Sequence, residues 1–230
     1  MHLLFKSESG LIDESCWTDV EFIRSRSVYI VTKTLAEKAA LDLAEELGLD
    51  LVSVIPTWIT GPFICAHCPD SVYVSMALIL GTFLILLLML NNVDIIALII
   101  AVLSVPLTII YIFLSTRAGD KGHYQHLKDS SLVHVDDVAR AHIHLLEHPE
   151  AKGRYICSAV EFTIEELCEF ISPRYPEHQM PTPDSWKDII PVKFSGFSTK
   201  KLQEIGFKYE NGLEETFDGA IKCCKEKGLL

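Results

Sequence analysis

Tyr29-Ile-Val-Thr-Lys33 and Leu51-Val-Ser-Val-Ile-Pro56 decide the fold, because together they predict a helix followed directly by a strand. The helix is amphipathic and continues to Gly48, a residue type that commonly ends helices. The apolar run that follows is typical of a buried parallel strand. The stretch Pro56-Thr-Trp-Ile-Thr-Gly-Pro-Phe63 then forms a loop at the carboxyl end of that strand. Open α/β sheets bind their ligands at this edge, so the order of elements predicts a site.

Tyr29 and Lys33 are the first candidates for chemistry. Residues four apart on a helix share one face, about 6 Å apart along the axis, so the phenol and the ammonium can enter one pocket. When a hydride reaches a ketone carbon, the developing oxyanion needs a proton, and a phenol beside a fixed positive charge can donate it. The alternative is a half-buried tyrosine and a solvated lysine with no chemical role.

The carboxyl half alternates between strands and helices. His134 and Asp136 are tempting as an acid and base, but a strand-to-helix junction needs such side chains for capping and anchoring, and we favour that role. The Thr163-Ile-Glu-Glu166 stretch is a capping box that opens a helix to Ile171. The other predicted strands are at 132–135 and 154–157. A helix capped by Asp136 or Asp137 is predicted to run to Leu146, and further helices are predicted at 198–205 and 213–227. This alternation predicts an α/β fold.

The segment from Val72 to Thr116 carries Asp94 as its only charged residue. Ile95–Leu114 is 20 residues long without a charge, enough to span a hydrocarbon core of about 30 Å. Met76–Leu90 is a shorter, weaker candidate for a second span, and residues 91–94 would be the turn between them. We therefore predict possible membrane contact through residues 76–114. The alternative is a buried helix in a large core.

The composition indicates an apolar segment within an otherwise charged chain. The mean hydropathy is +0.28, yet 22% of residues are charged and almost all of these lie outside the apolar segment. A net charge of −11 argues against nucleic acid or an anionic membrane surface as a partner. Seven cysteines, an odd number, with no amino-terminal signal peptide favour a reduced, cytoplasmic setting.

Metal binding is not favoured by the remaining candidate ligands. Cys65-Ala-His-Cys68 would need a second pair of ligands to hold structural zinc, and Cys157 and Cys168 lie in unrelated elements. Cys223 and Cys224 are interpreted as two thiols that face different ways. His144 and His148 share a helical face, but a solvated helix end explains them without a metal.

Several stretches resemble the plant dihydroflavonol reductase and vestitone reductase group of the extended short-chain dehydrogenases, within the NAD-dependent epimerase/dehydratase family. The resemblance covers about residues 11–81 and 123–230. The matching text is Asp13-Glu-Ser-Cys-Trp-Thr-Asp19, Tyr29-x-x-x-Lys33-Thr-Leu-Ala-Glu-Lys38, Cys68-Pro-Asp-Ser71, His134-Val-Asp-Asp-Val-Ala-Arg-Ala-His142 and Cys223-Cys-Lys-Glu-Lys-Gly228.

The resemblance implies an NADPH-dependent oxidoreductase of flavonoid biosynthesis that reduces a ketone of a flavonoid-like phenolic substrate. It implies the later part of a doubly wound Rossmann-type domain with a small carboxyl-terminal substrate lobe. Tyr29 would be the proton donor, while Lys33 would tune it and hydrogen-bond the nicotinamide ribose. The other cofactor-binding residues would be Pro56, Thr57, Trp58 and Ile59 at the nicotinamide end and Ser71 toward the phosphates.

The sequence also departs from that family. The Gly-rich turn that holds the cofactor diphosphate is missing, since Gly119-Asp-Lys-Gly122, the nearest spacing, is interpreted as a polar loop. The family's catalytic serine on the strand before the tyrosine is missing too. The expected division is residues 1–75, the second half of the dinucleotide-binding domain; 76–121, an apolar insertion; and 122–230, the remaining Rossmann elements and substrate lobe.

Three alternatives stay open at this point. The first is a truncated, non-catalytic remnant held at a membrane by its apolar insertion. The chain can also be a nucleotide-sugar epimerase or dehydratase, which uses the same tyrosine and lysine. Finally, deleting roughly Thr82 to Lys121 restores text that resembles the uninterrupted family, so a retained intron or a faulty gene model explains the insertion as well.

Overall fold

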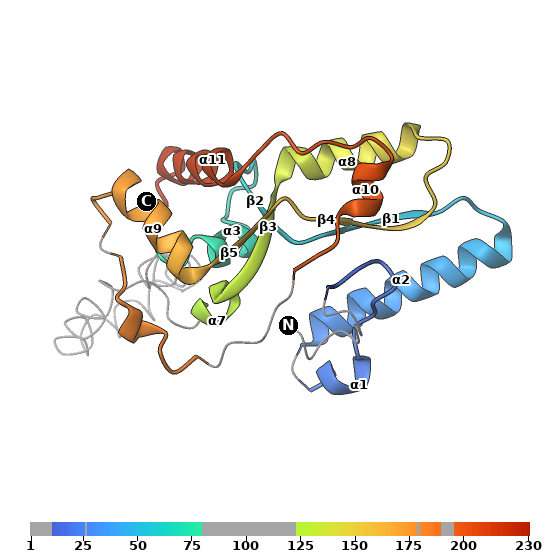
Figure 1. Ribbon diagram of the computed structural model, residues 1–230, viewed down its shortest axis with the longest axis horizontal. Coiled ribbons are helices and arrows are strands. Elements are labelled where there is room, and N and C mark those ends of the chain that lie inside the picture. Colours follow the sequence, from blue (N-terminus) through green and yellow to red (C-terminus); the bar gives the residue numbers. More distant parts are fainter. Residues whose placement is uncertain (1–10, 26, 80–122, 179, 190–195) are drawn as a thin grey trace, which may run out of the picture. The chain divides into compact units, whose positions relative to one another are not determined.

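The computed structural model describes residues 11–25, 27–79, 123–178, 180–189 and 196–230 (Figure 1). These residues form two compact units, each assembled from separate stretches of the chain. The first unit takes the described parts of residues 1–62, 129–161 and 192–219, and the second takes those of residues 63–128, 162–191 and 220–230. The predicted division at residues 75 and 121 stays a prediction.

A parallel pair of strands lies at the centre of the first unit. Strand β1 (Val52–Pro56) pairs with β4 (Gly153–Cys157) so that Val52 is opposite Gly153 and Pro56 is opposite Cys157. Two parallel strands need a long crossover connection, and helix α8 (Val135–Glu147) precedes β4 in the chain. The predicted parallel strand is confirmed, although its residues are half-buried and not fully buried.

A second, three-stranded sheet follows the order β2-β3-β5. Its strands are β2 (Trp58–Thr60), β3 (Asp129–His134) and β5 (Val160–Thr163). β2 runs parallel to β3, with Trp58 opposite Leu132 and Thr60 opposite His134. Because β2 begins two residues after β1 ends, the chain passes from one sheet to the other at the carboxyl end of β1.

Alternate residues of β1 and β4 face opposite sides, as the two-residue period of a strand requires. One face joins an apolar cluster with α8 and with α10 (Lys200–Glu204). The other face packs on the segment that precedes α2, and Figure 1 shows α2 on that side of the strands. The first cluster includes Tyr155, Cys157, Val138, Ala141, Leu145 and Leu202, and the second includes Ile55, Ile156, Ile12 and Cys16. Helices on both faces of parallel strands are the arrangement of a doubly wound α/β fold.

Helix α2 (Val28–Leu47) follows the short α1 (Val20–Ile23) and has well-defined ends. The Ser27 hydroxyl accepts a hydrogen bond from the amide of Ile30, and Gly48 ends the helix in the left-handed conformation, φ 65°. Its predicted extent and its glycine stop are confirmed. Among the described residues little covers it, because only Thr34 and Ala44 are buried.

The described part of the second unit consists largely of short helices. They are α3 (Asp70–Ser75), α7 (Tyr124–Leu127), α9 (Ile164–Arg174), the 3-10 turn η3 (Pro183–Ser185) and the second half of α11 (Leu213–Glu226). The predicted capping box is confirmed, since the Thr163 hydroxyl and the Glu166 carboxylate each accept a hydrogen bond from the other's backbone amide. Ile164, Leu167 and Ile171 are buried.

The predicted apolar insertion falls mostly outside the described residues. Of residues 76–121 the structure describes only 76–79, which are buried. Within the described ranges no helix is both long enough and apolar enough to cross a membrane. The polar loop predicted at residues 119–122 also lies outside them.

Candidate active site

Tyr29 and Lys33 lie one turn apart near the start of α2. The ammonium nitrogen of Lys33 is 5.7 Å from the centroid of the Tyr29 ring, which confirms that both side chains share one face. Tyr29 is 70% exposed. The phenol is therefore open to a ligand, and the helix holds a positive charge beside it.

Glu37 continues the same helical face one turn further on. Its carboxylate accepts a hydrogen bond of 2.6 Å from the Ser53 hydroxyl on β1 and forms an ion pair of 3.1 Å with Arg154 on β4. The Glu37 and Arg154 side chains are only 21% and 13% exposed. These contacts fix α2, and with it Tyr29 and Lys33, against the parallel strands.

The segment before α1 is also attached to Arg154. The guanidinium of Arg154 lies 3.6 Å from the centroid of the Trp17 ring and donates hydrogen bonds to the carbonyls of Glu14 and Cys16. The Glu14 carboxylate in turn accepts a hydrogen bond of 3.0 Å from the Ile156 amide on β4. The Asp13-Glu-Ser-Cys-Trp17 stretch therefore has a positioning role in the structure, because it holds β4 next to the helix.

Sequence reasoning missed the two residues that anchor the site. Glu37 and Arg154 are 117 positions apart, so no local pattern links them. One signal was present, since Glu37 lies four residues after Lys33 and so extends the face that begins at Tyr29. Nothing comparable marks Arg154 within its strand.

The loop after β1 is closely connected to the end of β4. The Thr57 amide donates to the Cys157 carbonyl at 3.1 Å, and the hydroxyls of Thr57 and Ser158 are 3.4 Å apart. Gly61 has φ +135°, and a Cβ there would lie 3.0 Å from the His134 ring, so only glycine fits without displacement. The predicted position of this segment, at the carboxyl end of β1, is confirmed. The prediction of a continuous loop over residues 56–63 was wrong, because Trp58–Thr60 pairs with β3 as strand β2.

The remaining cofactor candidates are placed as follows. Pro56 ends β1, Thr57 connects the two strands, and Trp58 and Ile59 are half-buried in β2, all within the first unit. Ser71 is half-buried in α3 and belongs to the second unit. Its assignment to the cofactor phosphates stays a prediction.

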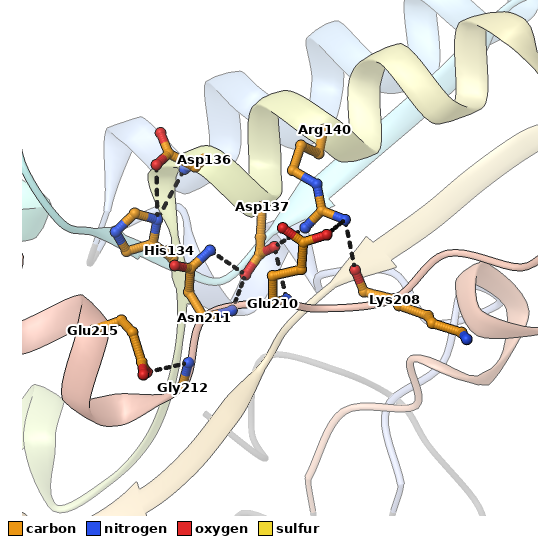
Figure 2. A network of polar contacts seen from close by, with 9 residues as sticks. All are labelled: His134, Asp136, Asp137, Arg140, Lys208, Glu210, Asn211, Gly212 and Glu215. Carbon is orange, nitrogen blue, oxygen red and sulfur yellow. Dashed lines mark hydrogen bonds and ion pairs between the residues drawn. The ribbon is translucent and has the colours of Figure 1, made fainter.

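Asp137 is the centre of a separate polar network (Figure 2). Its carboxylate is fully buried and accepts hydrogen bonds from Arg140 at 2.7 Å and from the backbone amides of Glu210 and Asn211 at 3.1 and 3.0 Å. Arg140 also pairs with Glu210 at 2.6 Å and donates to the Lys208 carbonyl. The network therefore holds residues 208–211 against α8, which is a structural role.

His134 takes the capping role at the start of α8 (Figure 2). Its Nδ1 accepts a hydrogen bond of 3.1 Å from the Asp136 amide. The prediction that Asp136 or Asp137 caps this helix was wrong, because the helix begins at Val135, between His134 and the two aspartates. The preference for a structural role of His134 over acid-base chemistry agrees with this contact.

His144 lies in the last turn of α8, and His148 is the residue that follows the helix. Nε2 of His144 is 3.0 Å from the Ile205 carbonyl, and the rings of His144 and His148 are 5.7 Å apart. Across the described part of the chain, no group of three or more histidine, cysteine, aspartate or glutamate side chains could hold a metal ion.

No protein-family model matches the chain. Dihydroflavonol 4-reductase of Zea mays is 40% identical over 245 aligned positions, which cover 99% of this chain and 57% of the relative. Vestitone reductase of alfalfa, Medicago sativa, is 37% identical over 97% of this chain and 58% of its own length. Its crystal structure has a TM-score of 0.73, with 97% of this chain and 61% of that chain covered. The yeast methylglyoxal/isovaleraldehyde reductase, solved with NADPH, shares the fold at 20% identity, a TM-score of 0.61 and coverage of 95% of this chain and 58% of that one.

Parallel strands with helices on both faces, together with the Tyr-x-x-x-Lys helix, define a fold of the extended short-chain dehydrogenase/reductase class. Within that class the chain is a homologue of the dihydroflavonol 4-reductases and vestitone reductase. It spans little more than half the length of these relatives.

Proposed function

We propose that the chain acts as an NADP-dependent oxidoreductase that reduces a ketone of a flavonoid-like phenolic substrate. The observation that carries this proposal is the exposed Tyr29 phenol beside the Lys33 ammonium on a helix anchored by Glu37. The two curated relatives described above are reductases by name, and this favours a ketone substrate over a nucleotide-sugar.

Tyr29 and Lys33 fit the chemistry of a nicotinamide cofactor and a ketone. When bound, NADPH supplies the hydride for the carbonyl carbon. As negative charge develops on the carbonyl oxygen, the Tyr29 hydroxyl donates its proton to that oxygen. The Lys33 ammonium stabilises the phenolate that remains and offers N–H donors to the ribose hydroxyls.

The segment from the end of β1 into β2 is the proposed contact for the nicotinamide end of the cofactor. Support comes from its position at the carboxyl end of a parallel strand, where doubly wound sheets bind ligands. The residues assigned to it are Pro56, Thr57, Trp58 and Ile59, with Ser71 assigned to the phosphates. The described cysteines are all free thiols, which fits a reducing compartment such as the cytoplasm.

NADPH consumption in the presence of dihydroflavonols and isoflavanones tests the proposal. In a Tyr29→Phe variant we expect turnover to fall by about 10²- to 10⁴-fold, the usual contribution of a general acid. NADPH binding, followed separately by titration, should survive in that variant because the ring remains. Unchanged turnover in Tyr29→Phe would overturn the assignment.

The matched control is Tyr175→Phe. Tyr175 also has a lysine over its ring, with the Lys225 nitrogen 5.4 Å from the centroid, but it follows α9 in the second unit. We expect this variant to turn over at the rate of the unaltered chain. The comparison separates the chemistry of the α2 pair from a general effect of removing a phenol beside a lysine.

A further inference from the structure

Asn211 and Gly212, directly before α11, are the only Asn-Gly pair in the sequence. Asparagine is one of the chemically labile residues of proteins, and it loses its amide when the backbone nitrogen of the next residue attacks the side-chain carboxamide. A following glycine favours this attack, because no side chain shields its amide nitrogen. Both residues are half-buried in the first unit, so they are not sealed from water.

The Gly212 amide, which is the nucleophile of this reaction, is held by Glu215 (Figure 2). Its N–H donates a hydrogen bond of 2.9 Å to the Glu215 carboxylate, which is one half of a capping box at the start of α11. The Gly212 carbonyl accepts a hydrogen bond of 2.6 Å from the Thr216 hydroxyl. While the Glu215 contact lasts, the nitrogen keeps its proton and its position.

The Asn211 carboxamide is held by a different carboxylate (Figure 2). Its Nδ2 donates to Oδ2 of the fully buried Asp137 at 3.2 Å, and the Asn211 backbone amide donates to the same oxygen at 3.0 Å. The two reacting groups are thus fixed by two separate acidic side chains. Glu215 is the exposed one of the two, and because water competes for an exposed hydrogen bond, its contact is the first to open.

We propose that Asn211 and Gly212 form a deamidation site, at which Asn211 becomes aspartate or isoaspartate when Glu215 releases the Gly212 amide. The site stands on the Asn-Gly pair and on the two carboxylates that hold its reacting groups apart from each other's chemistry. None of these residues belongs to the proposed reductase site, so the proposal survives if that function fails.

The chemistry balances without an oxidant or a reductant. The deprotonated Gly212 nitrogen attacks Cγ of Asn211, an N–C bond forms, the bond from Cγ to Nδ2 breaks, and ammonia leaves with the proton that the nitrogen gave up. Water then opens the resulting succinimide ring at one of its carbonyl carbons, and the bond from that carbon to the ring nitrogen breaks. Opening at Cγ gives aspartate, and opening at the backbone carbonyl gives isoaspartate. In total, one water is consumed and one ammonia is released.

The aspartate product no longer fits the polar network around Asp137. A carboxylate accepts hydrogen bonds and cannot donate them, so the bond from residue 211 to Asp137 is lost. A new negative charge then faces the buried carboxylate, and like charges repel. Arg140 already pairs with both Asp137 and Glu210, so its charge is shared before the modification occurs. We therefore expect deamidation to detach residues 208–211 from α8.

Peptide mass spectrometry of the full chain tests the site. The protein is incubated at mildly alkaline pH and digested, and the conversion of amide to acid at residue 211 is followed over time. We expect conversion to be several-fold faster in Glu215→Ala than in the unaltered chain, and fastest in the chain unfolded in urea, a comparison that needs no variant. The matched control is Glu226→Ala, which removes an exposed carboxylate from the last turn of the same helix and should convert at the rate of the unaltered chain.

Two results would overturn the proposal. The first is a Glu215→Ala chain that converts no faster than the unaltered chain, because Glu215 then does not hold the amide back. The second is a folded chain that converts as fast as the unfolded one, because the contacts of the folded chain then offer no protection.

Variants of Asn211 test the consequence of the modification. Asn211→Asp reproduces the aspartate product, whereas Asn211→Ser shortens the side chain and removes the carboxamide without adding a charge. We expect the urea midpoint of Asn211→Asp to lie below those of Asn211→Ser and the unaltered chain. A midpoint for Asn211→Asp equal to or above that of Asn211→Ser would contradict the detachment of residues 208–211 by charge repulsion.

Discussion

The Glu37 carboxylate on α2 and the Arg154 guanidinium on β4 lie 3.1 Å apart in a mostly buried ion pair. The pair is the connection between the helix that carries Tyr29 and Lys33 and the strands whose carboxyl ends form the proposed cofactor site. Arg154 meets further partners in the Trp17 ring and two backbone carbonyls, so its charge is compensated from several sides. Removing Glu37 should therefore weaken the attachment of α2 without leaving Arg154 unpaired.

Glu37→Gln is the first predicted change. The amide keeps the size of the side chain but loses the charge that pairs with Arg154, so we expect a loss of about 1.5–3 kcal/mol, typical of hydrogen bonds to charged groups. Urea unfolding measures this loss in the free energy of unfolding. The matched control is Glu45→Gln, on an exposed position of the same helix. Equal losses in the two variants would contradict an anchoring role for Glu37.

Asp137→Asn should lower the free energy of unfolding more than any substitution at an exposed position of α8. The carboxylate is fully buried and accepts from two backbone amides and from Arg140, and an asparagine would turn one acceptor into a donor. Removing one partner of a buried pair typically costs about 3–5 kcal/mol. Asp136→Asn, whose side chain is 70% exposed, is the control and should cost less than about 1 kcal/mol. Unfolding curves that coincide for the two variants would exclude this account.

Local sequence patterns predicted helices and their ends, but they did not predict contacts between residues that are far apart in the sequence. The extent of α2, its glycine stop and the Thr163 capping box could be derived from neighbouring residues, because capping and helical spacing act over four residues. The backbone amides that donate to Asp137 lie 73 and 74 positions away, so this pairing depends on the tertiary fold. The cap of α8 was assigned to an aspartate and not to His134, because aspartate is among the preferred capping residues and histidine is not.

The proposed site also combines features that the sequence predicts with contacts that it does not predict. Tyr29 and Lys33 could be paired from their spacing, and the loop after β1 could be placed from the order of elements. The contacts that hold them in position, from Glu37, Ser53 and Arg154, join separate segments and appear only in the folded chain.

The environment of Glu165 predicts that the stability of the second unit depends on pH. Burial raises the pKa of Glu165, but hydrogen bonds from Lys128 at 2.6 Å and from the Trp186 indole at 2.8 Å outweigh it, so the pKa lies below its ordinary value of 4.5. A carboxyl group whose pKa is lowered by folding stabilises the fold above its unfolded pKa. That contribution is lost as the pH falls through the folded pKa.

Unfolding midpoints measured from neutral to acidic pH check this expectation. Glu165→Gln should reduce the acid-induced loss of stability, and Trp186 fluorescence should report the change locally, since its indole contacts the carboxylate. The control is Glu169→Gln on the same helix. An acid profile that Glu165→Gln leaves unaltered would show that this carboxyl group does not titrate with folding.

Lys33→Met should remove the positive charge beside Tyr29 while keeping an unbranched side chain on α2. Lys33 is exposed, so we expect the unfolding midpoint to stay unchanged. Turnover of NADPH with the ketone should fall by about a hundredfold or more, because the phenolate left after proton donation loses its stabilising charge. Lys222→Met, at an exposed position of α11, removes an equal charge and should leave turnover intact. If both variants turn over NADPH at the same rate, Lys33 has no part in the proton transfer, and the proposed chemistry of the α2 pair is wrong.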